Sequence, residues 1–193
     1  MLALVAGLLL FLGAHSLAIA LPEKRAALIR QWGEQKWKAL VGIVSIAGFV
    51  LLVWGYGQAR MEPVWLWQSP VWTRHLAALL MLPSMILLVA TYVPGTHIKA
   101  RIGHPMLLAT KIWALAHLFA NGTLADLLLF GSFLGWAVLG FIIHRRRDRA
   151  AGTTYPAVSA SRDAIAVVVG LVLYGAFVGK LHVLLMGVSP FGT

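Results

Sequence analysis

The chain has 193 residues, of which 60% are hydrophobic and only 11% are charged, and its mean hydropathy is +0.84. Soluble domains carry about 25% charged residues, so this composition excludes an ordinary soluble protein and predicts one embedded in a lipid bilayer. The formal net charge is nevertheless +10. The absence of cysteine excludes disulfides, thiolate metal sites and cysteine nucleophiles.

Six apolar segments follow one another along the chain, and a membrane helix needs roughly 20 such residues to cross about 30 Å of hydrocarbon. They run from Met1 to Leu21, Ala39 to Gly57, His75 to Val93, Pro105 to Ala120, Leu124 to Ile143, and Ala164 to Val188. Most residues of each segment are apolar on all sides, as in lipid-embedded helices. We therefore predict one all-α domain over residues 1–193, folded as a polytopic bundle of six transmembrane helices.

The positive charge gathers in alternate connections between these segments. The first, third and fifth connections hold twelve lysines and arginines, whereas the other connections and the tail hold two. Cytoplasmic connections carry the excess of positive charge, so we expect a bacterial inner-membrane protein with both termini periplasmic. Nucleic-acid binders instead cluster cations on one folded surface, so no nucleic-acid partner is expected.

The first cationic connection has helical spacing of its own. Leu28, Trp32 and Trp37 recur among basic residues, a pattern typical of a helix that lies in the membrane interface. We expect such an interfacial helix on the cytoplasmic side.

Seven histidines are the side chains of this apolar chain that are best able to bind a metal or transfer a proton. His15, His117 and His182 lie within predicted spans and His104 opens one, and polar groups at membrane depth usually mark a functional site. The plainer alternative for each is a hydrogen bond to a neighbouring helix. Two histidines on facing apolar helices, with no acid beside them, are typical of membrane-bound haem b.

The fourth segment, GHPMLLATKIWALAHLFANG, presents two polar faces. At about 100° per residue, His104 and Lys111 share one face and His117 points about 140° away from His104. Asn121 follows His117 by one turn. Trp113 and Ala114 precede His117 by one turn, and the small Ala114 side chain leaves room for a flat macrocycle.

This segment, together with LGAHSLAIALP and LHVLLMGVSPFG, resembles the NnrU family, which includes the plant 15-cis-ζ-carotene isomerase. The resemblance covers essentially the whole chain. It implies a polytopic membrane protein that binds haem b, with His15 and His117 as the axial ligands of the iron. It also implies a link to denitrification and nitric-oxide metabolism. The plant motif reads Trp-Cys-Leu-Ala-His, and Ala114 stands here in place of the cysteine, so the isomerase's ligand-switch mechanism does not transfer.

The expected depths of the two ligands differ by about 12 Å at 1.5 Å rise per residue, which leaves two other pairs open. These are His15 with His104, and His117 with His182. The second pair brings haem near the outer face, where Arg74, Lys180 or His75 could meet its propionates. Lys180 could instead pair with Asp126.

The predicted function is that of a haem b protein with a redox or nitric-oxide-linked role, whose partners are the bilayer, a hydrophobic substrate or nitric oxide, and an electron-transfer protein. One alternative is a ζ-carotene-isomerase-like enzyme acting on a polyene within the bilayer. Another is a haemless assembly or transport factor whose histidines line a proton or metal path. Whether the protein is an enzyme stays open at this point.

Overall fold

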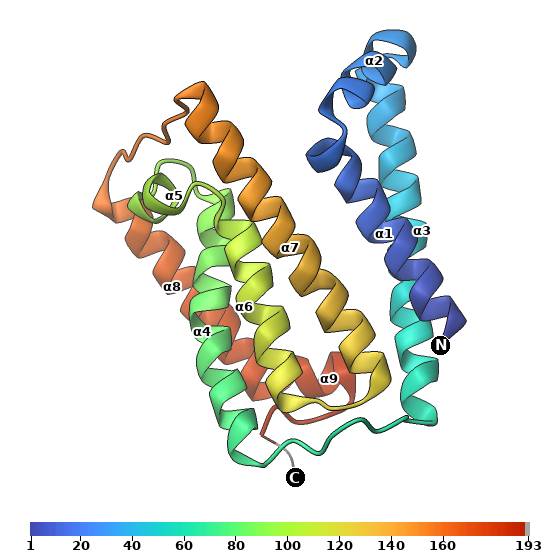
Figure 1. Ribbon diagram of the computed structural model, residues 1–193. Helices are drawn as coiled ribbons and strands as arrows, with labels where there is room; N and C mark the ends of the chain where they lie inside the picture. Colours follow the sequence, from blue (N-terminus) through green and yellow to red (C-terminus); the bar gives the residue numbers. More distant parts are fainter. Residues whose placement is uncertain (192–193) are drawn as a thin grey trace. The chain divides into compact units, whose positions relative to one another are not determined.

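The computed structural model describes residues 1–191, apart from the side chain of Ala18, and within this range it consists of helices joined by irregular connections (Figure 1). Within residues 1–191, β pairing is limited to an isolated antiparallel bridge between Trp65 and Thr123. The helices are α1 (Leu2–Ala20), α2 (Pro22–Trp32), α3 (Glu34–Met61), α4 (Trp72–Tyr92), α5 (His97–Ile102), α6 (Pro105–Ala120), α7 (Leu124–Ala151), α8 (Ala160–Ala176), the π-helical turn η1 (Phe177–Leu181) and α9 (His182–Met186).

Among the described residues, four helical runs are long and apolar enough to cross a membrane: α3, α4, α7 and the run Ala160–Met186. The pair α1 and α2 makes a fifth if the 85° bend between them is taken as one broken span. The helix α6 has only 16 residues, about 24 Å at 1.5 Å per residue, because Pro105 opens it and Asn121 ends it. The all-α prediction is confirmed, and four or five spans meet the length test where six were predicted.

The chain packs as two compact units, which are described separately. Unit 1 comprises Met1–Trp67 and Thr123–Trp136. Unit 2 comprises Gln68–Gly122 and the residues from Ala137 onward.

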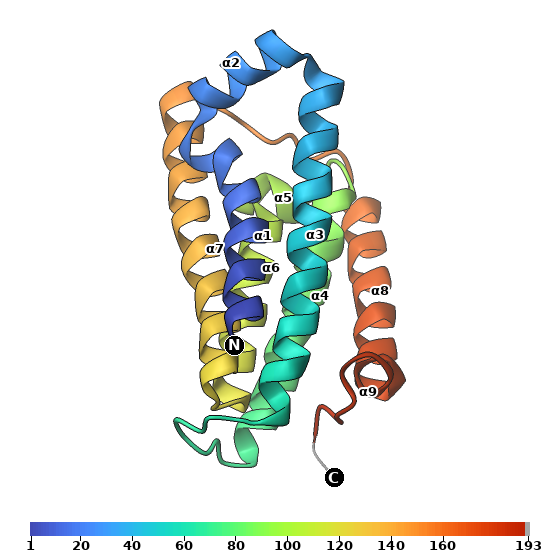
Figure 2. The same ribbon diagram turned by 90° about the vertical axis from the view of Figure 1, so that its right-hand side faces the viewer.

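In unit 1, α1 and α3 lie side by side as a helical hairpin (Figures 1 and 2). Glycines bring the two backbones together. A Cβ atom on Gly48 would lie 2.7 Å from the backbone nitrogen of Phe11, and one on Gly55 would collide with the backbone of Leu4. Small residues that let backbones approach are how helices associate in lipid, so this packing depends on glycine.

The start of α7 is fastened to α3 through Asp126, which is 5% exposed. Its Oδ1 accepts a 2.5 Å hydrogen bond from the hydroxyl of Tyr56, and its Oδ2 accepts from the backbone nitrogen and the hydroxyl of Thr123 at 3.0 and 2.6 Å. The hydroxyl of Thr123 in turn accepts from the backbone nitrogen of Asp126 at 3.2 Å. This reciprocal cap satisfies backbone donors that the first turn of a helix leaves open.

Replacing Asp126 with asparagine should lower the free energy of unfolding by about 1–3 kcal/mol, the usual cost of a buried polar group without a partner. The new amide group would meet a donor where the carboxylate had accepted. Equilibrium unfolding in mixed micelles with increasing SDS measures the change. Tyr56→Phe removes one of these bonds and should cost less, and a loss from Asp126→Asn no larger than that of Tyr56→Phe would contradict the prediction.

In unit 2, α4 packs against α6 and α8. The hydroxyl of Ser84 donates to the carbonyl of Ala109 at 2.9 Å, which joins α4 to α6. On the other side of α4, a Cβ atom on Gly170 would lie 2.7 Å from the Cα of Ile86. Small and polar residues therefore set the spacing of this three-helix layer.

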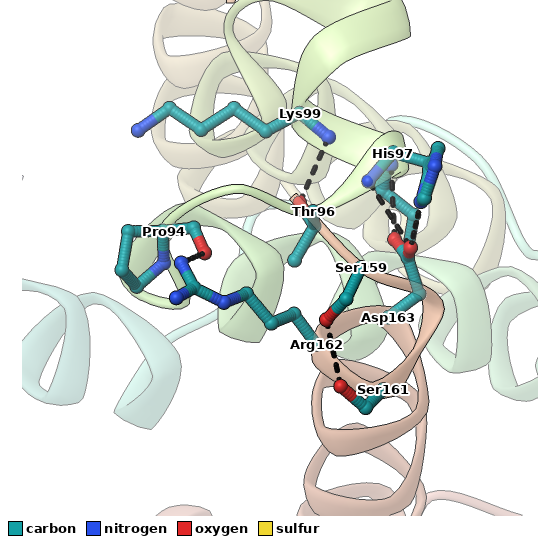
Figure 3. A network of polar contacts seen from close by, with 9 residues as sticks. Pro94, Thr96, His97, Lys99, Ser159, Ser161, Arg162 and Asp163 are labelled. Atoms are coloured by element: carbon teal, nitrogen blue, oxygen red, sulfur yellow. Dashed lines mark hydrogen bonds and ion pairs between the residues drawn. The ribbon is translucent and has the colours of Figure 1, made fainter. Parts of the chain in front are cut away.

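The third connection, residues 94–103, is held in place by the start of α8 (Figure 3). The carboxylate of Asp163 accepts from the backbone nitrogens of His97 and Ile98, both at 3.1 Å, and lies 2.6 Å from Nδ1 of His97. Arg162 donates to the carbonyl of Pro94 at 2.7 Å. These contacts cap α5, because a carboxylate at a helix N-terminus satisfies open backbone donors and opposes the helix dipole.

Candidate functional site

His15 lies on α1 in unit 1, on an exposed position of an apolar helix. Its Nδ1 is 2.7 Å from the carbonyl oxygen of Phe11, one turn earlier. A carbonyl only accepts, so this contact assigns the proton to Nδ1 and the lone pair to Nε2. The ring also packs against the ring of Phe11, with centroids 4.4 Å apart.

An aromatic cluster lies beside His15 within unit 1. The ring of Phe11 lies 6.0 Å from that of Phe49 and 5.8 Å from that of Phe133, centroid to centroid. Trp136 meets His15 edge-on at 6.3 Å. These side chains make an apolar, aromatic surface next to the imidazole.

The indole Nε1 of Trp136 is buried and has no hydrogen-bond partner within the described part of the chain. Buried donors are nearly always satisfied, so an orphaned one calls for an explanation such as a ligand or water. Sequence reasoning missed this residue. Its signal was a tryptophan in the middle of an apolar segment, away from the interface where tryptophan usually collects.

His117 lies on α6 in unit 2 and is half-buried. Its Nδ1 is 2.8 Å from the carbonyl oxygen of Trp113, and the two rings lie 5.4 Å apart. The proton is therefore on Nδ1 and the lone pair on Nε2, as in His15. Both histidines thus follow an aromatic residue by four positions, bond to its carbonyl and pack on its ring.

Two other predicted site residues on α6 have structural explanations. Asn121 ends the helix, and its side-chain amide donates to the carbonyl of His117 at 2.9 Å. Ala114 has no exposed surface, so its small side chain serves close packing in unit 2.

His104, the residue before α6, belongs to a polar cluster in unit 2. Its Nε2 is 2.8 Å from Oδ2 of Asp148, and the hydroxyl of Tyr155 donates to the same carboxylate at 3.1 and 3.2 Å. The ring of His144 lies 4.7 Å from that of His104. Burial, and then the hydrogen bond to Asp148, raise the pKa of the Tyr155 phenol, which keeps it a donor at neutral pH. The cluster ties the start of α6 to the end of α7.

Lys111 also has a partner within unit 2. Its Nζ lies 3.8 Å from the ring centroid of Phe141, a cation–π contact. The ring of Phe141 meets His104 edge-on at 6.4 Å. His104 and Lys111 therefore share a face of α6, as their spacing predicts.

Four further candidates lie in unit 2. Two are at the start of α4, and two are in or directly after the π-helical turn η1. His75, near the start of α4, stacks on Phe191 with centroids 5.6 Å apart. Nδ1 of His182 is 2.8 Å from the carbonyl oxygen of Val188, which closes the turn after α9. Lys180 lies in the π-helical turn and Arg74 in the first turn of α4.

The carboxylate of Asp126, in unit 1, is bonded to Tyr56 and Thr123, in place of the pairing with Lys180 that the sequence left open.

Within the described part of the chain, no three histidine or acidic side chains gather into a metal site. A haem iron needs only two imidazoles as axial ligands, so the lack of a three-residue cluster does not bear on haem binding. A shallow furrow of about 470 Å³ on unit 1 is lined by Leu10, Ala47, Val50, Leu51 and Trp54. Its apolar lining suits hydrocarbon.

Comparison with known proteins gives one informative match. No curated protein and no solved structure matches the chain. The family model described as NnrU protein matches residues 3–190. Nearly the whole chain is covered, including the segments around His15 and His117. The chain belongs to the NnrU family.

Proposed function

We propose that this chain is a membrane protein that binds haem b, with the imidazoles of His15 and His117 as axial ligands. The observation that carries the proposal is the local arrangement that the two histidines share. In each, Nδ1 bonds to the carbonyl of an aromatic residue four positions earlier, Phe11 or Trp113. Such a bond fixes the tautomer and ring orientation of a metal-ligating histidine and raises its basicity.

The other two histidines that were candidates for the iron do not have this arrangement. His104 uses Nε2 toward Asp148, and His182 bonds to a carbonyl six positions later, after its helix has ended. The contrast favours His15 and His117 over pairs that include His104. His182 also keeps the lone pair on Nε2, and it differs in that its carbonyl partner lies beyond the end of its helix and belongs to no aromatic residue.

The surroundings of His15 fit the chemistry of haem. Phe11, Phe133 and Trp136 offer an aromatic surface for an apolar macrocycle. The orphaned Nε1–H of Trp136 would find an acceptor in a carboxylate such as a propionate. Haem b, when bound, supplies one-electron redox chemistry, while the chain orients the imidazoles and excludes water from them.

The proposed setting is a bacterial inner membrane, with six spans that include the shorter helices α1 and α6, and with both termini periplasmic. The twelve-to-two distribution of cations supports this orientation. Family membership supports a redox role linked to denitrification or nitric oxide, served by an electron-transfer partner. A carotenoid-isomerase role would need a mechanism other than the ligand switch, because position 114 holds a fully covered alanine and supplies no thiolate.

The test is the absorption spectrum of the protein purified in detergent. A Soret band, sharp α and β bands on reduction, and a pyridine haemochrome assay giving stoichiometric haem b are expected. Protein that contains no haem, even after expression with added haem precursor, would overturn the proposal and favour a haemless assembly or transport factor.

Replacing Trp136 with phenylalanine should weaken haem retention about tenfold while leaving the ring packing in place. The lost hydrogen bond is worth about 1.4 kcal/mol, which corresponds to that factor. Transfer of haem to excess apomyoglobin measures the retention. Trp54→Phe, a tryptophan of the same unit that lines the apolar furrow, is the control. Equal transfer rates for the two variants would show that the indole N–H has no role in binding.

A further inference from the structure

Helix α2 is an exposed helix within unit 1. None of its residues is buried. It follows α1 after an 85° bend, and it runs across the end of the hairpin made by α1 and α3 (Figure 2). If α1 and α3 cross the bilayer, α2 lies along the membrane surface.

The large apolar residues of α2 gather on one side of the helix. At about 100° per residue, Leu28, Ile29 and Trp32 fall on one side, and Trp32 is 42% exposed. Arg30 falls on the other side, Lys24 lies at the edge of the apolar arc beside Leu28, and Arg25 falls within that arc. An apolar side that its own unit does not bury, with cations at its edge and opposite it, is the arrangement of helices that lie in the headgroup region. The long side chain of Arg25 can extend past this side to reach the headgroups.

The charge of this segment is strongly positive. From Pro22 to Lys38 there are five basic residues and two acidic ones. One of the two acids, Glu34, is bound to Lys38 at 2.8 Å. The uncompensated cations complement a surface of phosphate groups.

We propose that α2 binds the anionic phospholipid headgroups of the cytoplasmic leaflet. Leu28, Ile29 and Trp32 enter the boundary of the acyl chains, and Lys24 and Arg30 meet lipid phosphates. The position of α2 at the end of a membrane hairpin, its unburied apolar side and its charge together favour a lipid surface over a protein partner. The inference does not depend on haem binding.

The absence of cysteine makes the test direct, because a single introduced cysteine can carry a spin label. Leu28→Cys labels the apolar face and Gln31→Cys labels the polar side. The full-length labelled protein is placed in nanodiscs of phosphatidylcholine alone, or of phosphatidylcholine mixed with phosphatidylglycerol. Collisions with oxygen report immersion in lipid, and collisions with an aqueous nickel chelate report exposure to water.

In the anionic discs, the label at position 28 should be several-fold less accessible to the nickel chelate than in the neutral discs, whereas the label at position 31 should stay accessible. High salt should reduce the difference, because exposed charges are screened. The variant Lys24→Gln/Arg30→Gln should abolish it. A label at position 28 that is equally accessible in both kinds of disc would overturn the proposal.

The matched control removes two exposed cations from another helix end, Arg146→Gln/Arg149→Gln on α7. This variant should leave the accessibility at position 28 unchanged. An equal effect of the two double variants would mean that the net charge of the protein, and not α2, selects the lipid, and this too would overturn the proposal.

Discussion

Alanine in place of either His15 or His117 is expected to abolish the low-spin haem spectrum. Each substitution removes one imidazole lone pair from the iron. The expected product is haem-free protein, or five-coordinate high-spin haem with a shifted Soret band. Absorption and electron paramagnetic resonance spectra of the purified variants, normalised to protein, measure the change.

The matched control for this experiment is His97→Ala. His97 is a histidine outside the candidate site whose ring contacts the carboxylate of Asp163 (Figure 3). Its replacement should leave the spectrum unchanged. If the His15 and His117 variants both keep a normal low-spin spectrum, the ligand pair is wrong.

Two further alanine variants separate the remaining ligand pairs. His104→Ala should lose the hydrogen bond to Asp148 and keep the haem spectrum. His182→Ala should lose the bond to the carbonyl of Val188 and also keep it. A high-spin spectrum in either variant would assign an iron ligand to that histidine and exclude one member of the proposed pair.

Gly55→Ala should lower the stability of unit 1 by about 1–3 kcal/mol, the usual cost of overpacking a close contact. The new Cβ atom would collide with the backbone of Leu4. Backbone atoms cannot rotate aside as a flexible side chain can, so α1 would have to move away from α3. SDS-induced unfolding, or thermal unfolding in detergent, measures the loss.

The control for this change is Gly57→Ala, two residues further along α3. A Cβ atom there meets no atom within 4 Å. Alanine is a better helix former than glycine by about 0.8–1 kcal/mol, so this variant should be as stable as the natural protein or more stable. Similar results for the two variants would show that α1 and α3 do not depend on the close approach at Gly55.

The fold class could be predicted from composition and from the positions of the apolar segments, because a long uncharged run has few alternatives to a helix in lipid. The number of spans could not be settled in the same way. Whether α6 crosses the membrane depends on where it begins and ends. The structure places those limits at Pro105 and Ala120 and leaves a 16-residue helix.

The histidines also stood out in the sequence, since polar residues are rare within apolar segments. Their hydrogen bonds did not. The partner of His104 is Asp148, which lies 44 positions away, and the partner of Lys111 is the ring of Phe141. The unpartnered indole N–H of Trp136 could not be predicted from the sequence either, because an unsatisfied donor is recognised only when all of its neighbours are known.

By itself, the sequence determined that this is an all-helical membrane protein of the NnrU family, how its cations alternate along the chain, and which histidines merit attention. These properties are carried by local composition and by motifs of a few residues. Only the tertiary structure decided which nitrogen of His15 and His117 bears the proton, which polar groups are satisfied, and where glycine is required between α1 and α3. Those properties depend on distances between segments that are remote in sequence, or on the directions in which side chains point, and periodicity does not encode either.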